Sequence, residues 1–484
     1  MKRDLGALQA RQHDLLVIGG GIYGAITAWD AAQRGLATAL VDAGDFGSGT
    51  SWNSLKTVHG GLRHLQHADV PGLRESAFER AALLRIAPAL VAPLPFLVPA
   101  YGHGTRGREA LAVGLAANDL LTLDRNRGLP PERRVPRSRL LSRDEVLARL
   151  PGVERRGLTG GAVWHDAQIA STERLLVGFL EAASDAGTAL ANHAPAVALL
   201  RDGSRVAGAR VRDDETGLEA DVRARLVVNA TGPDLAAVAR LAGIASSPLP
   251  LLHAANLVLR RPVVAGQAVG AQSRGRFLFL VPWAGRALAG TDYRPLAEGP
   301  VDVEAFFEEV RQAFSWAGLE RADVALVHRG RVPGEGGASG LLTRSRLVDH
   351  EAEDGVPGLL SLLSVKYTTA RSLAEQAVDL AFRRLGRPPV RCRTAVTPLP
   401  AARPLTGPLA DRARHAVDHE AARGLTDAVL RRLDLGTTGA PPATDVTVVL
   451  EAMAARLGWD EARCASERQA LQAACAPPFA AAPG

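Results

Sequence analysis

The chain has 484 residues, 47% of them hydrophobic but only 4% aromatic, enough for two to four domains with mainly aliphatic cores. The formal net charge of +6 is small for this length, the arginines are spread along the chain and no nucleic-acid-binding motif is present, so nucleic-acid binding is not expected. Three sparse cysteines without CxxC spacing argue against zinc and a disulfide framework, and no stretch of about 18 apolar residues is free of charge and proline, which argues against a membrane span.

Residues 1–12 are polar and carry no secretory signal, so a cytoplasmic protein is expected, with attachment to the inner face of the cell membrane left open. Lysine is rare, since only Lys2, Lys56 and Lys366 occur among 57 Lys and Arg residues. Arginine does not replace lysine where a compact ammonium is needed. The two internal lysines, Lys56 and Lys366, are therefore candidates for specific roles.

The first elements predict a dinucleotide-binding βαβ unit. Residues 14–18 form an apolar strand, 25–33 a helix and 37–41 a second strand, and a G-x-G-x-x-G turn over residues 19–24 joins the first strand to the helix. Glycines allow the backbone to approach a pyrophosphate, and the helix N-terminus favours its negative charge. Asp42 follows the second strand about 20 residues later, where an acid accepts from ribose hydroxyls.

Seven arginines lie between Arg125 and Arg143. They form either a solvated face or a surface for anionic lipid or a partner. Ser142 and Glu145 have the spacing of a capping box, which predicts that a short helix begins there.

A later apolar strand over residues 224–228 runs into Ala230-Thr231-Gly232. A strand ending in Ala-Thr-Gly is a second signature of FAD proteins of the glutathione-reductase type, and its glycine lets the chain pass close to the nucleotide. No second glycine motif for another nucleotide follows. These features favour FAD over NAD.

Several segments, in the same order along the chain, resemble the FAD-dependent glycerol-3-phosphate dehydrogenases. Residues 47–63 are similar to the family's flavin-contacting loop, T-S-x-x-S-x-K-L-I-H-G-G-x-R-Y-L, and residues 366–371 to G-G-K-x-T-T-Y-R, a loop that closes over the flavin. Residues 278–283 resemble its F-x-I-P-W strand and 290–292 its G-T-T-D, while 415–475 are similar to its helical C-terminal appendix.

The resemblance implies an α/β fold: an FAD-binding Rossmann-like domain of the glutathione-reductase type, an inserted α+β substrate domain and a small C-terminal helical domain. We expect the FAD domain over 1–80, 150–235 and 325–392, and the substrate domain, with a mostly antiparallel sheet above the pocket, over 81–149 and 236–324. We expect a linker over 393–410, helices over 411–475 with a break at 436–442, and a disordered tail over 476–484.

The cofactor and substrate candidates follow from the motifs and the resemblance together. The expected FAD-binding residues are Gly19, Gly21, Ile22, Tyr23, Gly24, Asp42, Thr50, Ser51, Lys56, Thr57, His59, Thr231, Gly232, Lys366 and Thr368. Lys56 has the alternative role of stabilising its own loop. The candidates for substrate binding and catalysis are His59, Arg63, His64, Asn256, Arg344 and Lys366. A phosphate requires two or three fixed cations, and the oxidation of an alcohol requires a base.

The chain departs from the family pattern mainly on the substrate side. Arg331 precedes Val332, whereas the family has G-V-R-P, so the guanidinium is expected to turn away from the pocket. Asn256 stands where the family has a histidine, His64 where it has a tyrosine, and Ala370 where it has another tyrosine. His59, His64 and His253 are the replacement candidates for the base.

The sequence therefore predicts an FAD-dependent dehydrogenase that oxidises a secondary alcohol of a small phosphorylated polyol, sn-glycerol 3-phosphate if the substrate is unchanged. Electrons would pass to a quinone at the membrane surface or to oxygen, and a homodimer is left open. The alternatives are an oxidase or dehydrogenase of another alcohol, an amine or an amino acid, and a flavoprotein that has lost this catalysis.

Overall fold

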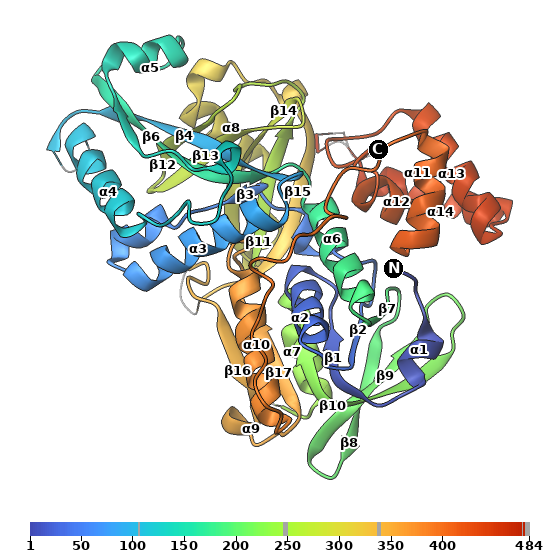
Figure 1. Cartoon of the computed structure of the whole chain (residues 1–484). Coiled ribbons are helices and arrows are strands. Elements are labelled where there is room, and N and C mark those ends of the chain that lie inside the picture. The colour runs from blue at the N-terminus through green and yellow to red at the C-terminus, as the bar shows by residue number, and fades with distance from the viewer. Residues whose placement is uncertain (105–106, 245–249, 336–339, 477, 480–484) are drawn as a thin grey trace.

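The computed structural model describes residues 1–104, 107–244, 250–335, 340–476 and 478–479, which form two β-sheets and a group of C-terminal helices (Figure 1). In Figure 1 the first sheet lies below the second, and the C-terminal helices lie at the upper right, beside the second sheet and above β7. Within these ranges no helix is long and apolar enough to cross a membrane. The predicted α/β fold is confirmed.

The first sheet contains the predicted βαβ unit. Its strand order is β16-β17-β10-β1-β2-β7, and all neighbours are parallel except β16 and β17. Its strands are β1 (His13–Ile18), β2 (Thr38–Val41), β7 (Ala189–Ala191), β10 (Glu219–Asn229), β16 (Arg346–Asp349) and β17 (Leu359–Leu363). Every residue of β1 is buried, as expected for a parallel strand covered on both faces. The segments that follow β1, β2, β10 and β17 meet at one edge.

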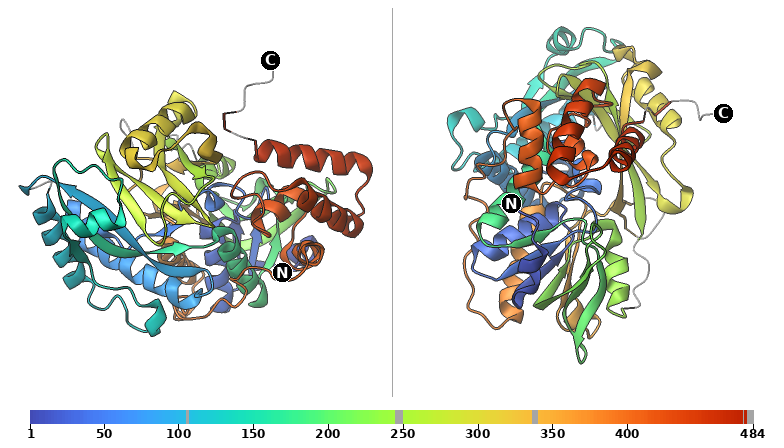
Figure 2. Two further views of the ribbon diagram at one scale, coloured as in Figure 1. Left: turned by 90° about the horizontal axis from the view of Figure 1, so that it is seen from above. Right: turned by 90° about the vertical axis from the view of Figure 1, so that its right-hand side faces the viewer.

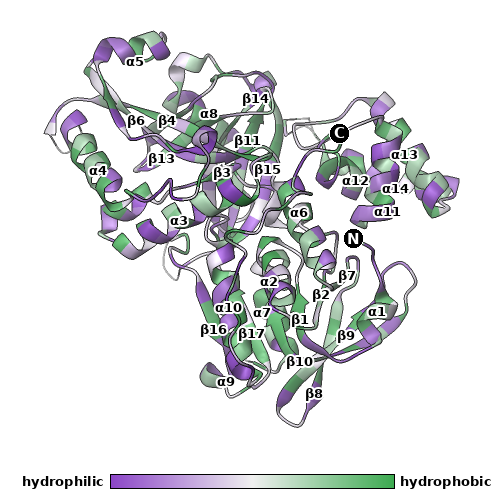
Figure 3. Ribbon diagram, viewed as in Figure 1, coloured by the Kyte–Doolittle hydropathy of each residue, from purple (hydrophilic) through white to green (hydrophobic). Residues whose placement is uncertain are grey.

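Helices and a hairpin cover the two faces of this sheet. The helices α2 (Ile22–Gln33), α6 (Thr172–Asp185) and α10 (Ala370–Arg384) share one core with β1, and α3 (Val70–Ile86) reaches the same core. The other face is covered by α1 (Leu5–Gln9), α7 (Leu235–Leu241) and the hairpin of β8 (Ala196–Asp202) and β9 (Arg205–Arg212). A one-turn helix, α9 (His350–Glu353), follows β16. Figure 3 shows β1 and β17 as hydrophobic strands between these layers.

The second sheet is mostly antiparallel, as expected. Its strand order is β15-β11-β14-β13-β12-β4-β6-β3, β5 pairs with β6, and β4 and β12 are the parallel neighbours. Its strands are β3 (Thr57–Val58), β4 (Val91–Tyr101), β5 (Arg139–Leu141), β6 (Leu158–Ile169), β11 (Leu251–Leu259), β12 (Ala268–Ser273), β13 (Arg276–Trp283), β14 (Arg286–Pro295) and β15 (Val324–Pro333).

The two faces of the second sheet have different surroundings. The helices α5 (Arg143–Arg149) and α8 (Val303–Ala313) pack on one face. The other face carries Phe96, Val281 and Trp283, and Leu55 packs against it. A further helix, α4 (Arg108–Leu121), lies at the margin near α3 (Figure 1). Ser142 and Glu145 form the predicted capping box at the start of α5, which confirms that signal.

In the C-terminal part, the residues that the structure describes form four helices with a core of their own: α11 (Leu409–Glu420), α12 (Leu425–Arg431), α13 (Ala443–Leu457) and α14 (Glu461–Ala474). The predicted break at 436–442 falls between α12 and α13, as expected. Buried ion pairs fasten this part to the first sheet: Asp45 accepts from Arg432 at 2.7 Å, and Arg174 binds Glu420 at 2.8 Å. The views in Figure 2 agree with Figure 1 that these helices lie beside α6.

The structure corrects two expectations about organisation. We expected residues 150–235 and 325–392 in the FAD domain, but β6 and nearly all of β15 belong to the second sheet, so the boundaries at 150 and 325 cut through it. A strand's own sequence does not tell which sheet it will join, because its partners are distant in the chain. Of the expected disordered tail, residues 477 and 480–484 lie outside the described residues, while Phe479 packs against Phe307 at 5.9 Å between ring centroids.

Candidate active site

The turn between β1 and α2 requires glycine at two positions. Gly19 has φ +106°, and a Cβ there would lie 2.7 Å from the carbonyl oxygen of Ala230. A Cβ on Gly24 would lie 1.8 Å from the carbonyl oxygen of Gly19. Gly21 is the N-cap of α2, and the backbone N–H of Ile22 donates to Ser51 Oγ at 3.0 Å. The helix N-terminus therefore opens onto the loop of residues 50–56.

Asp42 lies beside this turn, directly after β2. Its carboxylate accepts hydrogen bonds from the backbone N–H groups of Gly20, at 2.5 Å, and Gly44, at 2.8 Å. Burial raises the pKa of Asp42 to about 6. From the neighbouring strand, Thr231 and Gly232 follow β10, and Gly232 has φ +60°. Close backbone approach, an open helix N-terminus and an acid after the second strand fit the pyrophosphate and ribose of a dinucleotide.

The loop after this edge connects the two sheets. Thr50, in the short 3-10 helix η1 (Thr50–Trp52), donates from Oγ1 to the carbonyl oxygen of Arg331 in β15 at 2.7 Å. Asn53 donates to the carbonyl oxygen of Arg329 at 2.5 Å. Asn256, buried in β11, donates from Nδ2 to the carbonyl oxygen of Asn53 at 3.0 Å. Asn256 thus anchors the loop of residues 50–56, the candidate flavin-contacting loop, to the second sheet.

Lys56 is fully buried in this loop and has φ +59°. Its Nζ lies 2.6 Å from Glu173 Oε1, 2.6 Å from Thr172 Oγ1 and 2.7 Å from the carbonyl oxygen of Trp52. An ammonium has three N–H donors, and these three acceptors use all of them. The geometry favours the loop-stabilising role that the sequence left as the alternative to a cofactor contact.

His59 follows β3 and lies half-exposed between an acid and an aromatic wall. Its Nδ1 is 3.0 Å from Asp166 Oδ2, and its ring centroid is 5.9 Å from that of Phe96 and 6.3 Å from that of Phe279. Asp166 also accepts from the Gly60 backbone N–H at 2.7 Å and from Arg80 at 3.0 Å. The buried carboxylate fixes the proton on Nδ1, which leaves Nε2, 3.1 Å from Thr57 Oγ1, as the acceptor.

A second histidine joins two candidate cations. In the 3-10 helix η2 (Leu62–His67), His64 lies with Nε2 3.1 Å from Lys366 Nζ and Nδ1 2.8 Å from Asp69 Oδ2. The other oxygen of Asp69 accepts from Arg344 at 3.0 Å. Burial lowers the pKa of Lys366, and burial together with the nearby Lys366 lowers the pKa of His64. The structure therefore brings together His64, Lys366 and Arg344.

The loop that carries Lys366 is held against the nucleotide-binding turn. The Tyr23 hydroxyl donates to the Lys366 carbonyl oxygen at 2.8 Å and lies 2.9 Å from Ser364 Oγ. The backbone N–H of His59 donates to Thr368 Oγ1 at 3.2 Å. Segments 57–64 and 364–369 thus meet in space, as expected if both face the flavin.

The remaining candidates are less closely tied to this group. Arg63 is exposed, and its guanidinium forms no hydrogen bond or ion pair with the residues that the structure describes. Arg331 pairs with Asp234 at 3.1 Å, in the segment after β10, while Val332 is buried. His253 lies in β11, opposite Arg331 in the strand register.

Two acids at this site were not found by sequence reasoning. Asp166 follows Trp164 and His165 within β6, and Asp69 caps α3 by accepting from the backbone N–H of Gly72. Neither belongs to a motif. The capping position of Asp69 before Pro71 was a readable signal for the helix start, but not for its contact with His64.

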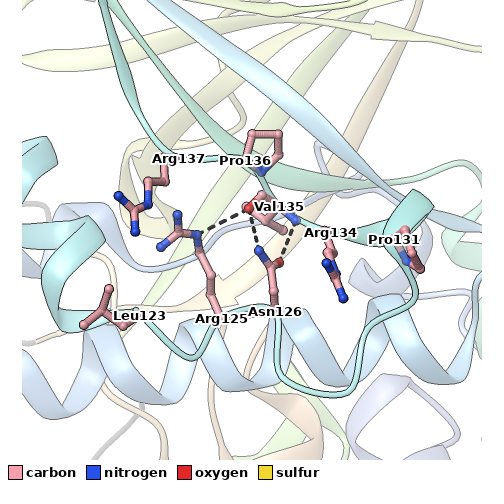
Figure 4. A pocket seen from close by; sticks show the side chains of 8 residues that line it. All are labelled: Leu123, Arg125, Asn126, Pro131, Arg134, Val135, Pro136 and Arg137. Atoms are coloured by element: carbon pink, nitrogen blue, oxygen red, sulfur yellow. Dashed lines mark hydrogen bonds between the residues drawn. The ribbon is translucent and has the colours of Figure 1, made fainter.

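The arginine-rich segment lies apart from these residues. Figure 4 shows Asn126 paired with the backbone of Val135, with bonds of 2.9 and 2.7 Å, and the guanidinium of Arg125 beside them. Arg125 is buried and fixes this connection, whereas Arg134 and Arg137 are exposed at the hollow that Leu123 also lines. The segment is therefore partly structural and partly a solvated basic surface.

The glycine-rich turn after β1, the acid Asp42 and the loop of residues 50–56 that joins the two sheets are typical of a dinucleotide-dependent oxidoreductase. The profile of the family described as FAD dependent oxidoreductase (DAO) matches residues 14–320. The glycerol-3-phosphate dehydrogenase of Synechocystis sp. is 31% identical over 426 residues, which cover 83% of this chain and 75% of that protein. The chain thus belongs to the FAD-dependent oxidoreductase family that includes the glycerol-3-phosphate dehydrogenases, and FAD is its cofactor.

Two further similarities support this assignment. The mitochondrial glycerol-3-phosphate dehydrogenase of Mesocricetus auratus is 35% identical over 407 residues; the alignment covers 79% of this chain but only 54% of that longer protein. The X-ray structure of the Bacillus halodurans glycerol-3-phosphate dehydrogenase complexed with FAD superposes with a TM-score of 0.75 at 22% identity, over 99% of this chain and 98% of that one. The latter likeness concerns the fold.

Proposed function

We propose that the enzyme oxidises the secondary alcohol of sn-glycerol 3-phosphate to the ketone of dihydroxyacetone phosphate. The observation that carries the proposal is the contact between segments 57–64 and 364–369, with Lys366 Nζ 3.1 Å from His64 Nε2. This contact brings cations close to a histidine–carboxylate pair, next to the turn between β1 and α2. The named activity of the relatives supports the same substrate.

The cations suit a phosphorylated substrate. Lys366 and Arg344 are linked through His64 and Asp69, and Arg63 lies on the same short helix as His64. Phosphate is bound best by fixed cations, with arginine supplying paired donors. We propose that these three cations hold the phosphate.

His59 is the best candidate for the base. Its Nδ1 is committed to Asp166, so Nε2 can accept the hydroxyl proton of the substrate. His64 is less suited, because its Nε2 accepts from the Lys366 ammonium, whereas the partner of His59 Nε2 is the neutral Thr57 hydroxyl. When bound, FAD supplies the acceptor for the hydride.

We further propose that the cofactor is held by residues of three segments. The β1–α2 turn would hold the pyrophosphate, and Asp42 would hold the ribose hydroxyls. The segment after β10 would pass close to the nucleotide. Thr50, Ser51, Thr57, His59, Lys366 and Thr368 would then surround the flavin. The ammonium of Lys56 is excluded from this set, since its donors are taken.

Anaerobic reduction of the purified flavoprotein tests the proposal. Addition of sn-glycerol 3-phosphate should bleach the oxidised-flavin band, and His59→Gln should slow the bleaching by about 10²–10⁴-fold, the usual contribution of a general base. A yellow wild-type protein that bleaches instead with an amine or amino acid would assign it to that class. A protein that bleaches with none of these would be a flavoprotein without this catalysis.

The route of the electrons is proposed to end at a quinone on a membrane surface. Val113, Leu120 and Leu123 are 73%, 68% and 64% exposed along and just after α4, and the exposed Arg134 and Arg137 line the adjoining hollow. Apolar side chains beside arginines suit an anionic bilayer, at roughly 1 kcal/mol per arginine near the surface. At low salt the protein should co-sediment with anionic vesicles, and the Leu120→Glu variant should stay in the supernatant.

Oxygen is the competing acceptor. Stoichiometric hydrogen peroxide during turnover, without stimulation by a soluble quinone, would replace the quinone in this proposal. The sequence left a homodimer open, and sedimentation equilibrium of the holoenzyme decides between one and two chains.

A further inference from the structure

We propose that His64 is a positioning residue that ties the Lys366 ammonium to the Arg344 guanidinium through Asp69. The four side chains form one array of successive contacts, of 3.1, 2.8 and 3.0 Å. The proposal rests on the proposed function, because it assigns a task to the cations that would bind the substrate phosphate.

The array joins segments that are distant in the chain. Arg344 precedes β16, Lys366 follows β17, and His64 and Asp69 lie in the segment between β3 and α3. Asp69 is fixed independently, since its Oδ1 also accepts from the Gly72 backbone N–H at 3.2 Å as the cap of α3. His64 and Asp69 are mostly buried, with side-chain exposures of 16% and 12%. The start of α3 thereby fixes Asp69, which binds the 75% exposed Arg344 directly and Lys366 through His64.

The direction of each hydrogen bond follows from the donors present. An ammonium has only donors, so Nε2 of His64 must accept from Lys366. The proton of the neutral imidazole then lies on Nδ1 and is donated to Asp69 Oδ2, while Oδ1 accepts from Arg344. The groups that face His64 are Lys366 on one side and the carboxylates of Asp69 and Glu75 on the other.

An imidazole can do this because its two nitrogens lie on opposite sides of the ring. The tyrosine that the family pattern has at this position offers a single oxygen and cannot make both contacts at separate atoms. In this chain, therefore, the substitution builds a fixed link between two cations. Its expected effect is to set their separation before the substrate phosphate arrives.

Two amide variants separate the two contacts. In His64→Gln, Oε1 can occupy the position of Nε2 and accept from Lys366, whereas in His64→Asn the amide reaches only the position of Nδ1 and Asp69. We expect His64→Asn to slow flavin reduction by sn-glycerol 3-phosphate by about 10–100-fold, because misplacement of a positioning group by about 1 Å can cost up to 10²-fold. His64→Gln keeps the contact with Lys366 but loses the contact with Asp69, so the link is broken here too and flavin reduction should slow by a similar factor.

His67→Gln is the matched control, since His67 is exposed in the same short helix; it should leave the rate unchanged. A wild-type rate in either amide variant would overturn the proposal, because each of them keeps only one of the two contacts that make the link. Flavin content and circular dichroism identify a variant that has not folded.

A readout without turnover uses ¹⁵N NMR of the oxidised holoenzyme with labelled histidine, in which His64 is assigned by its absence in His64→Gln. The Nδ1–H form is expected, and Lys366→Met should raise the pKa of His64 by removing a neighbouring positive charge. An Nε2–H form, or a pKa that does not move, would refute the link. If the substrate fails to reduce even the wild-type flavin, the proposed function fails, while this NMR result still decides the array.

Discussion

Replacing Lys56 by methionine is expected to destabilise the protein by about 3–5 kcal/mol, the usual cost of removing one partner from a buried ion pair. Lys56 and Glu173 are both fully buried, 2.6 Å apart. Without the ammonium, the hydrogen-bond donors left to the Glu173 carboxylate among the described residues are the hydroxyls of Ser171 and Thr172, at 3.2 and 3.1 Å. Two hydroxyls do not compensate for a charge removed from water.

Thermal unfolding provides the assay. A cooperative unit of about 250 residues loses about 2 °C in Tm for each kcal/mol, so the variant should unfold about 6–10 °C below wild type. The double variant Lys56→Met, Glu173→Leu removes the stranded charge and should recover most of this loss, since replacement of a buried pair by apolar side chains is often neutral. Lys2→Met, at an exposed lysine, is the matched control and should unfold with wild type.

Flavin content separates the two roles considered for Lys56. If the double variant recovers its Tm and retains FAD, the lysine acts through the loop. A double variant that recovers its Tm but binds no FAD would show a direct cofactor contact and refute the reasoning from the saturated ammonium. A single variant that unfolds within about 2 °C of wild type would refute the energetic argument itself.

Three further outcomes are expected. Gly24→Ala puts a methyl group 1.8 Å from the carbonyl oxygen of Gly19, so the purified variant should lack the flavin absorbance band; a yellow variant would contradict the close packing. Arg432→Met removes one of the two buried arginines that bind Asp45, while Arg431 stays paired with it, so the variant should lose about 1.5–3 kcal/mol in urea unfolding, the usual range for hydrogen bonds to charged groups. A loss below about 1 kcal/mol would argue against a buried pair. Although burial acts to raise it, the pKa of Asp166 is lowered by its histidine and arginine partners. The stability advantage of wild type over Asp166→Asn should therefore be complete above about pH 5 and shrink as pH falls below about 4, as urea titrations at several pH values can measure.

The sequence predicted the first βαβ unit and its glycine-rich turn well, because the signals for them are local. The glycines of residues 19–24 and the acid at Asp42 report steric and charge requirements of a single βαβ unit. The break near 436–442 and the cap at Ser142 are equally local, and both are confirmed. Each of these features depends on residues within a few positions of one another or on one short connection.

The substrate side was less predictable because its contacts are distant in the chain. Asp166 and Asp69 look like ordinary surface acids in the sequence, yet each lies against a histidine of the candidate site. For Lys56 the motif left two roles, a cofactor contact or the stabilisation of its loop, and the contact that favours the second role comes from Glu173, more than 100 positions away. The membership of β6 and β15 in the second sheet was hidden for the same reason.

The order of strands in the first sheet has a consequence for synthesis of the chain. β1 lies between β2 and β10, and β17 lies beyond β10, so the edge that receives FAD is assembled from residues made early, midway and late. At 5–20 residues per second, roughly 20–70 s separate β1 from β17 on the ribosome. The Tyr23 hydroxyl can form its hydrogen bond only once the Lys366 carbonyl has been synthesised, after an equally long interval. We therefore expect the complete FAD-binding edge to form only near the end of translation.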